Sequence, residues 1–198
     1  MLCYKALVRF LVVPALALLA SACGPASLAS STFEGDNEGW SLSNNGQLTA
    51  PTLAREGGNP AGNLCGRDEG DGDIWYFVAP QKYLGNTSAA MGKRLTFDLK
   101  QGSIFNQVRG RDVVLNGGGL AVTWFFRFPP GLDWTPYSVR FDATSGWRID
   151  DPTGVGADAT EGDLRTVLSD LRSLRIRGEF FDGPNDTACI DNVYLGRD

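Results

Sequence analysis

The strict alternation of apolar and polar side chains in several short windows constrains the fold most. In residues 94–100, Leu95, Phe97 and Leu99 alternate with polar residues. A similar period of two runs through Leu120–Phe128, Tyr137–Asp142 and Leu174–Phe181. Because successive side chains of a strand point to opposite faces, each window predicts a strand with one face in a core. Two further windows are predicted as strands, Asp73–Val78 and Ile190–Leu195.

Turn signals and one helical pattern complete the fold prediction. Glycine is abundant, with 25 among 198 residues, and clusters such as the one at 116–119 separate the predicted strands. Thr160 or Asp163 can cap a helix whose apolar residues have helical spacing, namely Leu164, Val167, Leu168 and Leu171. We therefore predict an all-β domain over residues 33–198, a jelly-roll type β-sandwich with one short helix.

Residues 1–22 have the layout of a secretory signal. Lys5 and Arg9 precede an apolar run over residues 10–20, which is too short to cross a bilayer as a permanent helix. The run ends in Ala-Ser-Ala, which fits a signal-peptidase site, and together with Cys23-Gly24 it also resembles a bacterial lipobox. We expect an exported protein whose residues 23–32 form a flexible tether.

The number of cysteines bears on which processing occurs. Cys3 would leave with the signal, so an unmodified Cys23 would leave an odd thiol in an oxidising compartment. Lipidation of Cys23 would leave Cys65 and Cys189 as a pair. We therefore predict a lipid anchor at Cys23, which holds the protein in the membrane of the cell envelope, and a Cys65–Cys189 disulfide. A secreted protein without an anchor, and two separate thiols, remain the alternatives.

Composition argues against several classes of function. The chain has no histidine, which removes the commonest general base and the commonest zinc ligand. Its formal charge of −5 argues against general nucleic-acid binding, which needs a basic surface. No nucleophile elbow, zinc-protease motif or P-loop is present, so we expect no enzymatic activity. A glycoside hydrolase remains a weaker alternative, although nothing selects a carboxylate pair such as Asp150 and Asp151.

A series of short motifs resembles the laminin B domain (laminin domain IV). The motifs follow one another in the family's order and cover about residues 33–196. They are the turn at 57–62, Asp68, the segments 75–80, 83–86, 95–99 and 112–117, the helix at 167–171, and the segments 174–178 and 191–193. Ala61 departs from the family, which often has Gly there. The resemblance implies an extracellular β-sandwich similar to galactose-binding-like carbohydrate-binding modules, with a structural rather than enzymatic role.

The same resemblance suggests a structural calcium ion. Carbohydrate-binding modules of this fold often hold calcium between the start of the domain and the last strand. Here Glu34 and Asp191 would supply carboxylate oxygens, and the turn at Asn59 could add others. The alternative is that Glu34 lies on a solvated turn and Asp191 caps a strand end.

Arginines on the polar side of the predicted strands suggest a ligand-binding face. The candidate residues are Arg94, Arg127, Arg140, Arg175 and Arg177, with Phe125 and Thr123 among them. Guanidinium groups bind carboxylates, sulfates and sugar hydroxyls, so we predict a binding module for a glycan or another surface component. One alternative is a ladder of ion pairs with Asp98, Asp142 and Glu179. Another is a structural or adhesion protein that binds a protein partner.

Overall fold

The computed structural model describes residues 27–68, 74–151, 154–181 and 186–198. The predicted signal, Cys23 and the first part of the predicted tether lie outside the described residues. Residues 69–73, which include Glu69, Asp71 and Asp73, also lie outside them.

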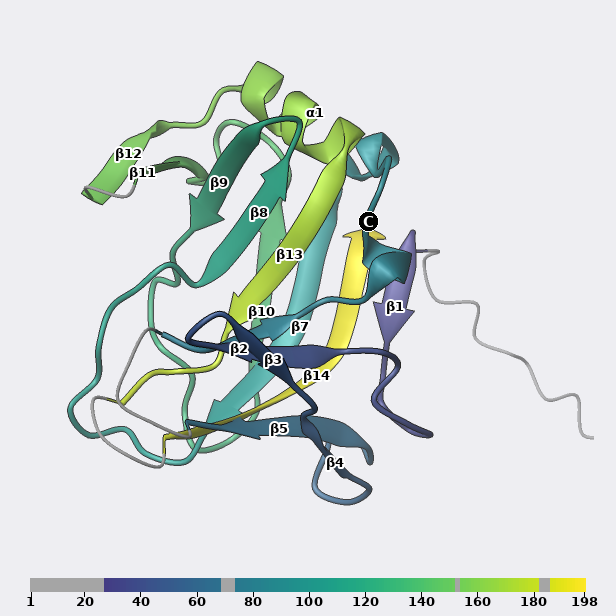
Figure 1. Ribbon diagram of the computed structural model, residues 1–198, viewed down its shortest axis with the longest axis vertical. Coiled ribbons are helices and arrows are strands. Elements are labelled where there is room, and N and C mark those ends of the chain that lie inside the picture. Colours follow the sequence, from purple (N-terminus) through teal and green to yellow (C-terminus); the bar gives the residue numbers. More distant parts are fainter. Residues whose placement is uncertain (1–26, 69–73, 152–153, 182–185) are drawn as a thin grey trace, which may run out of the picture.

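The chain folds into a β-sandwich of two antiparallel sheets, as predicted (Figure 1). One sheet has six strands: β10 (Thr135–Arg140), β7 (Arg94–Gln101), β14 (Thr187–Arg197), β5 (Asn63–Arg67) and β4 (Thr52–Ala54) in this order, with β1 (Ala29–Ser31) also paired to β14. The other has eight: β12 (Gly154–Asp158), β11 (Arg148–Asp151), β9 (Leu120–Trp124), β8 (Val113–Gly117), β13 (Leu171–Arg177), β6 (Tyr76–Val78), β2 (Ser41–Asn44) and β3 (Gln47–Thr49). Two short 3₁₀ helices, η1 (Gln81–Tyr83) and η2 (Ser88–Ala90), follow β6.

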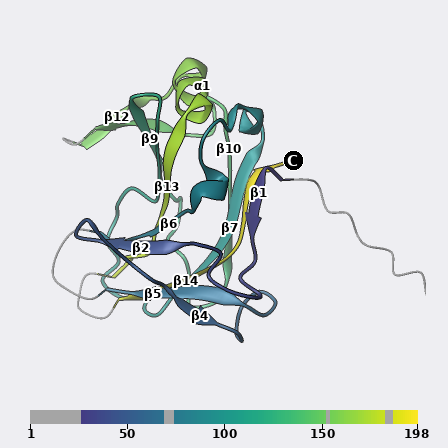
Figure 2. The ribbon, with the colours of Figure 1, turned by 45° about the vertical axis from the view of Figure 1, so that its right-hand side comes forward.

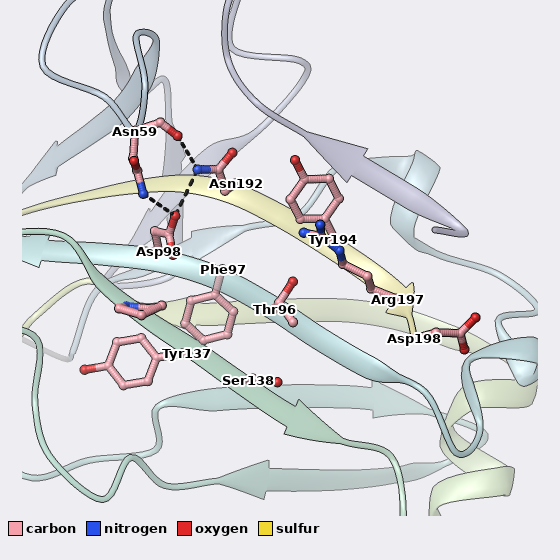
Figure 3. A pocket seen from close by; sticks show the side chains of 11 residues that line it. Asn59, Thr96, Phe97, Asp98, Tyr137, Ser138, Asn192, Tyr194, Arg197 and Asp198 are labelled. Carbon is pink, nitrogen blue, oxygen red and sulfur yellow. Dashed lines mark hydrogen bonds between the residues drawn. The ribbon is translucent and has the colours of Figure 1, made fainter. Parts of the chain in front are cut away.

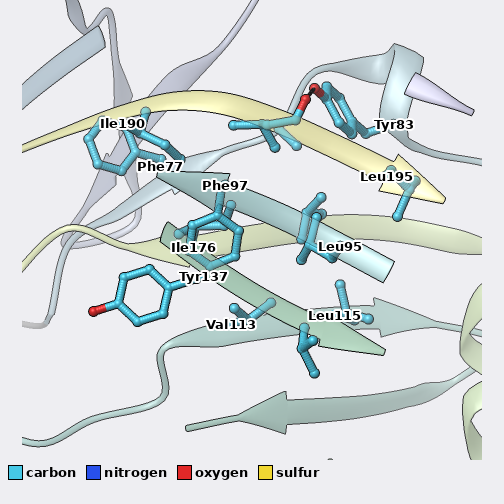
Figure 4. Packing of buried hydrophobic residues seen from close by; sticks show 14 of the residues in the cluster. Phe77, Tyr83, Leu95, Phe97, Val113, Leu115, Tyr137, Ile176, Ile190 and Leu195 are labelled. Atoms are coloured by element: carbon cyan, nitrogen blue, oxygen red, sulfur yellow. Dashed lines mark hydrogen bonds between the residues drawn. The ribbon is translucent and has the colours of Figure 1, made fainter. Parts of the chain in front are cut away.

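The alternating side chains of β7 form the centre of the core. Leu95, Phe97 and Leu99 are at most 1% exposed. Figure 4 shows β7 side chains facing Val113 and Ile176 of the eight-stranded sheet. The apolar face of each sheet is therefore buried against the other, which is the main source of stability in a sandwich.

The predicted helix forms as α1 (Glu161–Ser169), which lies at one end of the sandwich (Figure 1). Thr160 is its N-cap, and the side chains of Thr160 and Asp163 each bond the other's backbone N–H in a capping box. Leu171, which has helical spacing in the sequence, is buried as the first residue of β13. Among the described residues, no helix is long and apolar enough to span a membrane.

The strand predicted over Leu120–Phe128 ends earlier, at Trp124. The carboxylate of Asp112 accepts a hydrogen bond from the backbone N–H of Phe126 at 2.6 Å, in place of a strand partner. The chain then leaves the sheet, and Phe128 is 67% exposed instead of facing the core.

The domain begins earlier than predicted. Residues 29–31, which we expected in the tether, form β1 and lie alongside β14 in Figures 1 and 2. The buried Ser31 hydroxyl accepts hydrogen bonds from Trp40 Nε1 at 2.9 Å and from the Tyr83 hydroxyl at 3.0 Å. These bonds attach the segment to the core, so it is part of the domain.

The predicted disulfide is confirmed. Cys65 of β5 and Cys189 of β14 are direct cross-strand neighbours, and their sulfur atoms are bonded. The bridge joins residues 124 positions apart in the sequence, and so ties the early part of the chain to the last strand.

Candidate binding groove on the six-stranded sheet

A hollow of about 720 Å³ lies on the outer face of β10, β7 and β14 (Figure 3). Antiparallel pairing puts the outward side chains of the three strands into rows. Ser138 lies opposite Thr96, and Thr96 lies opposite Tyr194. Because directly opposed Cβ atoms are about 5 Å apart, each row presents three neighbouring side chains to one ligand. This hollow is called the groove below.

One end of the groove is a fixed network of amides around Asp98. Asp98 Oδ2 accepts hydrogen bonds from Asn59 Nδ2 at 3.0 Å and from Asn192 Nδ2 at 2.9 Å. Asn192 Nδ2 also donates to the backbone carbonyl of Asn59. Figure 3 shows these three side chains meeting from different segments of the chain. Their remaining oxygens accept no hydrogen bond from the described residues, so they can accept bonds from a ligand.

Asp191 is buried beneath the amide network and holds the backbone of both asparagines in place. Its carboxylate is 1% exposed and accepts hydrogen bonds from the backbone N–H groups of Asn59 at 2.6 Å and Asn192 at 2.7 Å. Burial raises the pKa of Asp191 to about 6; the nearby charges of Asp98 and Glu34 add to the rise, and the two hydrogen bonds oppose it. The turn at Asn59 is thereby held against β14.

The three residues of the predicted calcium site lie in this region. Asn59 bonds Asp191 directly, and Glu34 is close enough to influence the pKa of Asp191. Within the described residues, however, no group of three or more His, Cys, Asp or Glu side chains is arranged to hold a metal ion. Calcium binding by Glu34, Asn59 and Asp191 therefore stays a prediction.

The middle of the groove combines hydroxyl groups with an aromatic ring. Tyr194 lies half-buried under the guanidinium of Arg197, 4.4 Å from the ring centroid. Thr96 Oγ1 is buried and has no hydrogen-bond partner within the described chain. Ser138 Oγ accepts a hydrogen bond from Arg94 Nη1 at 3.1 Å, and the exposed ring of Pro136 lies one row away. The surface therefore offers apolar ring faces beside groups that form hydrogen bonds.

The predicted single arginine face is wrong. Arg94 and Arg140 lie opposite each other on the six-stranded sheet, whereas Arg175 and Arg177 belong to β13 of the other sheet. Arg127 follows the end of β9 and lies in a loop. Alternation shows which side chains of a strand point outward, but it does not show to which sheet the strand belongs.

Arg177 is a buried structural residue rather than part of an exposed surface. It is 2% exposed, and its Nη2 lies 2.6 Å from Asp112 Oδ1. Its Nη1 donates to the carbonyl of Val108 at 3.1 Å, and its guanidinium lies 4.4 Å from the Phe180 ring centroid. Burial raises the pKa of Asp112, and Arg177 opposes that rise.

The other predicted ligand-binding residues line two smaller hollows. Phe125 and Arg127 line one of about 200 Å³ together with Arg177. Arg175 lies over the ring of Tyr76 at 5.1 Å and lines one of about 430 Å³ on the eight-stranded sheet. These residues therefore do not share a site with Arg140.

The predicted ladder of ion pairs is also largely absent from the described residues. Asp142 lies 3.9 Å from Arg140, but Asp98 bonds amides and Glu179 accepts a hydrogen bond from the backbone of Trp75. Asp150, one of the two carboxylates considered for glycoside hydrolysis, pairs with Arg111. Its neighbour on β11 is Asp151, and adjacent strand residues point to opposite faces, so the two cannot face each other across a cleft.

Several residues of the groove were not among the predicted ligand-binding residues. The alternation of β7 and β10 already placed Thr96 and Ser138 on polar faces. No local pattern in the sequence indicates that β14 lies beside β7 and contributes Tyr194, Asn192 and Arg197. Hence the polar faces were predictable, and their combination into a groove was not.

Comparisons with known proteins agree with this fold. The family model described as Laminin B (Domain IV) matches residues 76–197. Laminin subunit gamma-2 of Equus caballus is 32% identical over 130 residues, which cover 62% of this chain and 10% of that protein. Laminin subunit gamma-1 of Danio rerio is 29% identical over 167 residues, which cover 83% of this chain and 10% of that protein.

A solved structure of a laminin domain has a similar fold. The L4b domain of human laminin alpha-2 superposes with a TM-score of 0.66 at 14% identity, over 84% of this chain and 96% of that domain. The chain spans about a tenth of the length of the two laminin subunits that it matches. The match of the family model covers more than half of the chain, from β6 to the end of β14, and confirms the resemblance seen in the motifs. The chain belongs to the Laminin B (Domain IV) family.

Proposed function

We propose that this chain is a non-catalytic extracellular binding module that holds a glycan in the groove across β10, β7 and β14. A sugar ring has apolar faces and a rim of hydroxyl groups that both donate and accept hydrogen bonds. The groove offers the matching features, with Tyr194 and Pro136 beside the hydroxyls of Thr96 and Ser138 and the oxygens around Asp98. Sites for small ligands typically combine apolar walls with a few fixed polar groups.

The observation that carries the proposal is the buried, unpartnered hydroxyl of Thr96 at the centre of the middle row. A buried hydroxyl without a partner costs free energy, and most such groups in proteins are paired. Thr96 lines the groove between Ser138 and Tyr194, so a rotation of its side chain that exposes the oxygen would let a sugar hydroxyl pair with it.

A binding role fits the acids of the groove better than catalysis does. A glycoside hydrolase needs one carboxyl group kept protonated, usually by burial. Asp98 is held by two amide groups, and the side chain of Asp198 is 70% exposed and lies 3.7 Å from Lys93. Neither carboxylate has the apolar surroundings of a general acid, and the buried Asp191 does not line the groove.

The proposed location outside the cell rests on the disulfide and on the family. Disulfides persist mainly in oxidising compartments, and Cys65–Cys189 is formed. The relatives include subunits of laminin. A lipid anchor at Cys23 is the part of this proposal that fixes the domain to a membrane.

The test is binding of the exported protein to a glycan array, followed by titration with the glycans that bind. We expect saturable binding that Tyr194→Ala weakens by about tenfold, the usual loss at a central aromatic contact. Phe105→Ala is the matched control, because Phe105 is 74% exposed and lies outside the groove. An array without signal from folded protein, or equal losses in the two variants, would contradict the proposal.

A second candidate function, binding of a protein partner, is favoured by an apolar patch on two neighbouring loops. Gln101 joins the loops, since its backbone N–H bonds Gly131 and its side chain bonds Gln107 at 2.8 Å. Large apolar side chains on these loops are 53–74% exposed: Ile104, Phe105, Phe128 and Leu132. Exposed apolar patches often mark interfaces. If this function holds, Phe105→Ser with Phe128→Ser abolishes binding to a purified envelope or matrix protein, and Tyr194→Ala leaves it unchanged.

A further inference from the structure

Three arginines from neighbouring strands form a row at one end of the groove. Arg140 of β10 lies opposite Arg94 of β7, and Arg94 lies opposite Arg197 of β14. Arg94 and Arg140 belong to the outer face, because Leu95 and Val139, which alternate with them, are buried in the core. Arg197 follows a shift of register in β14, and it lines the groove with its guanidinium over the ring of Tyr194. These three residues are called the arginine row.

The arginine row has few carboxylates to balance it. Arg140 has Asp142 at 3.9 Å, the long end of the range for an ion pair. Arg94 donates to the neutral hydroxyl of Ser138, and Arg197 lies over an aromatic ring. Among the described residues neither of them forms an ion pair. Like charges directly opposite each other in a sheet destabilise it.

The carboxylate next to the row in sequence is already paired. Lys93, which immediately precedes β7, lies 3.7 Å from the side chain of Asp198, so this pair leaves the charge of the arginine row unbalanced. The whole chain carries a net charge of −5, which makes a local excess of cations the exception on its surface. An unfavourable arrangement of this kind is expected where function requires it.

The row is continuous with the groove. Arg197 lines the groove itself, and Arg94 bonds Ser138, which also lines it. A sugar ring that contacts Tyr194 would therefore hold a substituent close to the guanidinium of Arg197. Arginine binds carboxylate and sulfate groups through paired N–H donors.

We propose that the glycan held in this groove is acidic and that Arg94, Arg140 and Arg197 bind its carboxylate or sulfate groups. This inference rests on the proposed function and specifies the class of ligand. The polarity of the groove supports a glycan with separated charges over a polyanion such as nucleic acid. Its opposite end holds the carboxylate of Asp98, which would repel a continuous line of phosphates.

The experiment compares three probes by calorimetric titration of the exported protein: a sulfated heparin oligosaccharide, a carboxylated oligogalacturonate and a neutral cello-oligosaccharide. We expect an acidic probe to bind more tightly than the neutral one and to weaken as sodium chloride rises. Arg94→Gln and Arg197→Gln should each weaken binding of the acidic probe by about tenfold, the usual worth of a hydrogen bond to a charged group. The sulfated and carboxylated probes distinguish the two sources of charge.

Two controls separate binding from folding. Arg165→Gln removes the same charge from α1, where Arg165 pairs with Glu161 away from the groove, and should leave the affinity for the acidic probe unchanged. Arg94→Gln should also leave the melting temperature of the free protein unchanged or raised, because it relieves repulsion in the arginine row. A residue with a purely structural role would lower it.

The outcomes separate this inference from the proposed function. If the neutral probe binds as tightly as the acidic ones, and Tyr194→Ala weakens it, the inference is overturned and the proposed function stands. If an acidic probe binds with an affinity that the substitutions of Arg94 and Arg197 do not change, the inference is also overturned, because the acidic group is bound elsewhere. If no probe or array glycan binds, both fail.

Discussion

Replacement of Arg177 by methionine should destabilise the fold without a direct effect on the groove. Arg177 Nη2 lies 2.6 Å from Asp112 Oδ1, and the two side chains are 3% and 4% exposed. Methionine retains much of the apolar stem but removes the positive charge. The carboxylate of Asp112 then stays buried, and the hydrogen bond that it accepts from the backbone N–H of Phe126 is the interaction that still stabilises its charge.

The cost follows from the burial of both partners. Breaking a buried ion pair by removal of one side typically costs about 3–5 kcal/mol, because the other charge is left uncompensated. The free energy of unfolding of a domain of this kind is about 5–15 kcal/mol, so Arg177→Met should remove a large share of the stability. We expect the midpoint of urea unfolding to fall accordingly while the slope of the transition stays unchanged.

The pH dependence of this variant gives an independent check. Arg177 opposes the rise that burial causes in the pKa of Asp112, so its removal should raise that pKa further. The folded state then holds a proton that the unfolded state releases at lower pH, and stability falls as pH rises through this interval. The deficit of Arg177→Met should therefore be largest at neutral pH and shrink on acidification.

The matched control is Arg175→Met, two residues earlier in β13. Arg175 forms no ion pair within the described residues and lies over Tyr76, so its loss should cost about 1 kcal/mol or less. Equal unfolding midpoints for the two variants would refute the reasoning, as would a loss at Arg177 that does not depend on pH.

Four further predictions concern other parts of the chain. Replacement of Cys65 and Cys189 by serine should lower the free energy of unfolding by about 4–5 kcal/mol, the loop-closure value for a separation of this size, measured by urea unfolding. Because burial raises the pKa of Asp191 to about 6, its ionisation should destabilise the fold as pH rises from about 4 to 6, seen as a falling melting temperature. If calcium binds there, millimolar calcium at pH 7 should raise the melting temperature, and an unchanged value would refute the predicted site. If Cys23 carries a lipid, mass spectrometry should show acyl chains on it, and Cys23→Ala should move the protein from the detergent phase to the aqueous phase.

The elements that sequence predicts best are those with local causes. The alternation in β7 and the capping residues of α1 act over a few positions, and both elements form where expected. The extension predicted for β9 failed because Asp112, ten or more residues away in the chain, takes the N–H of Phe126. The segment at 29–31 was misjudged for a similar reason, since its partner β14 lies at the other end of the chain.

The arginines illustrate the same limit at the level of function. Alternation places Arg140, Arg175 and Arg177 on the polar side of their strands, and the sheet order then separates them into different surfaces. Arg177 is buried even so, because Asp112 and Phe180 cover it. A polar residue in an alternating pattern thus predicts which way its side chain points from the strand, but it does not predict whether that side chain is exposed to solvent.

The last strand shows how one local irregularity builds the groove. Strict alternation from the buried Ile190 would turn Val193 and Leu195 outward, yet both are fully buried. Between Asp191 and Tyr194 the register shifts, and Asn192 adopts a φ of 52°, a left-handed conformation that asparagine tolerates better than most residues. The extra residue changes the phase of the strand, as a β-bulge does. It buries Asp191 beneath the turn at Asn59, brings the Asn192 amide to Asp98 and turns Tyr194 outward into the groove, so the residues that interrupt the pattern are those that the proposed site uses.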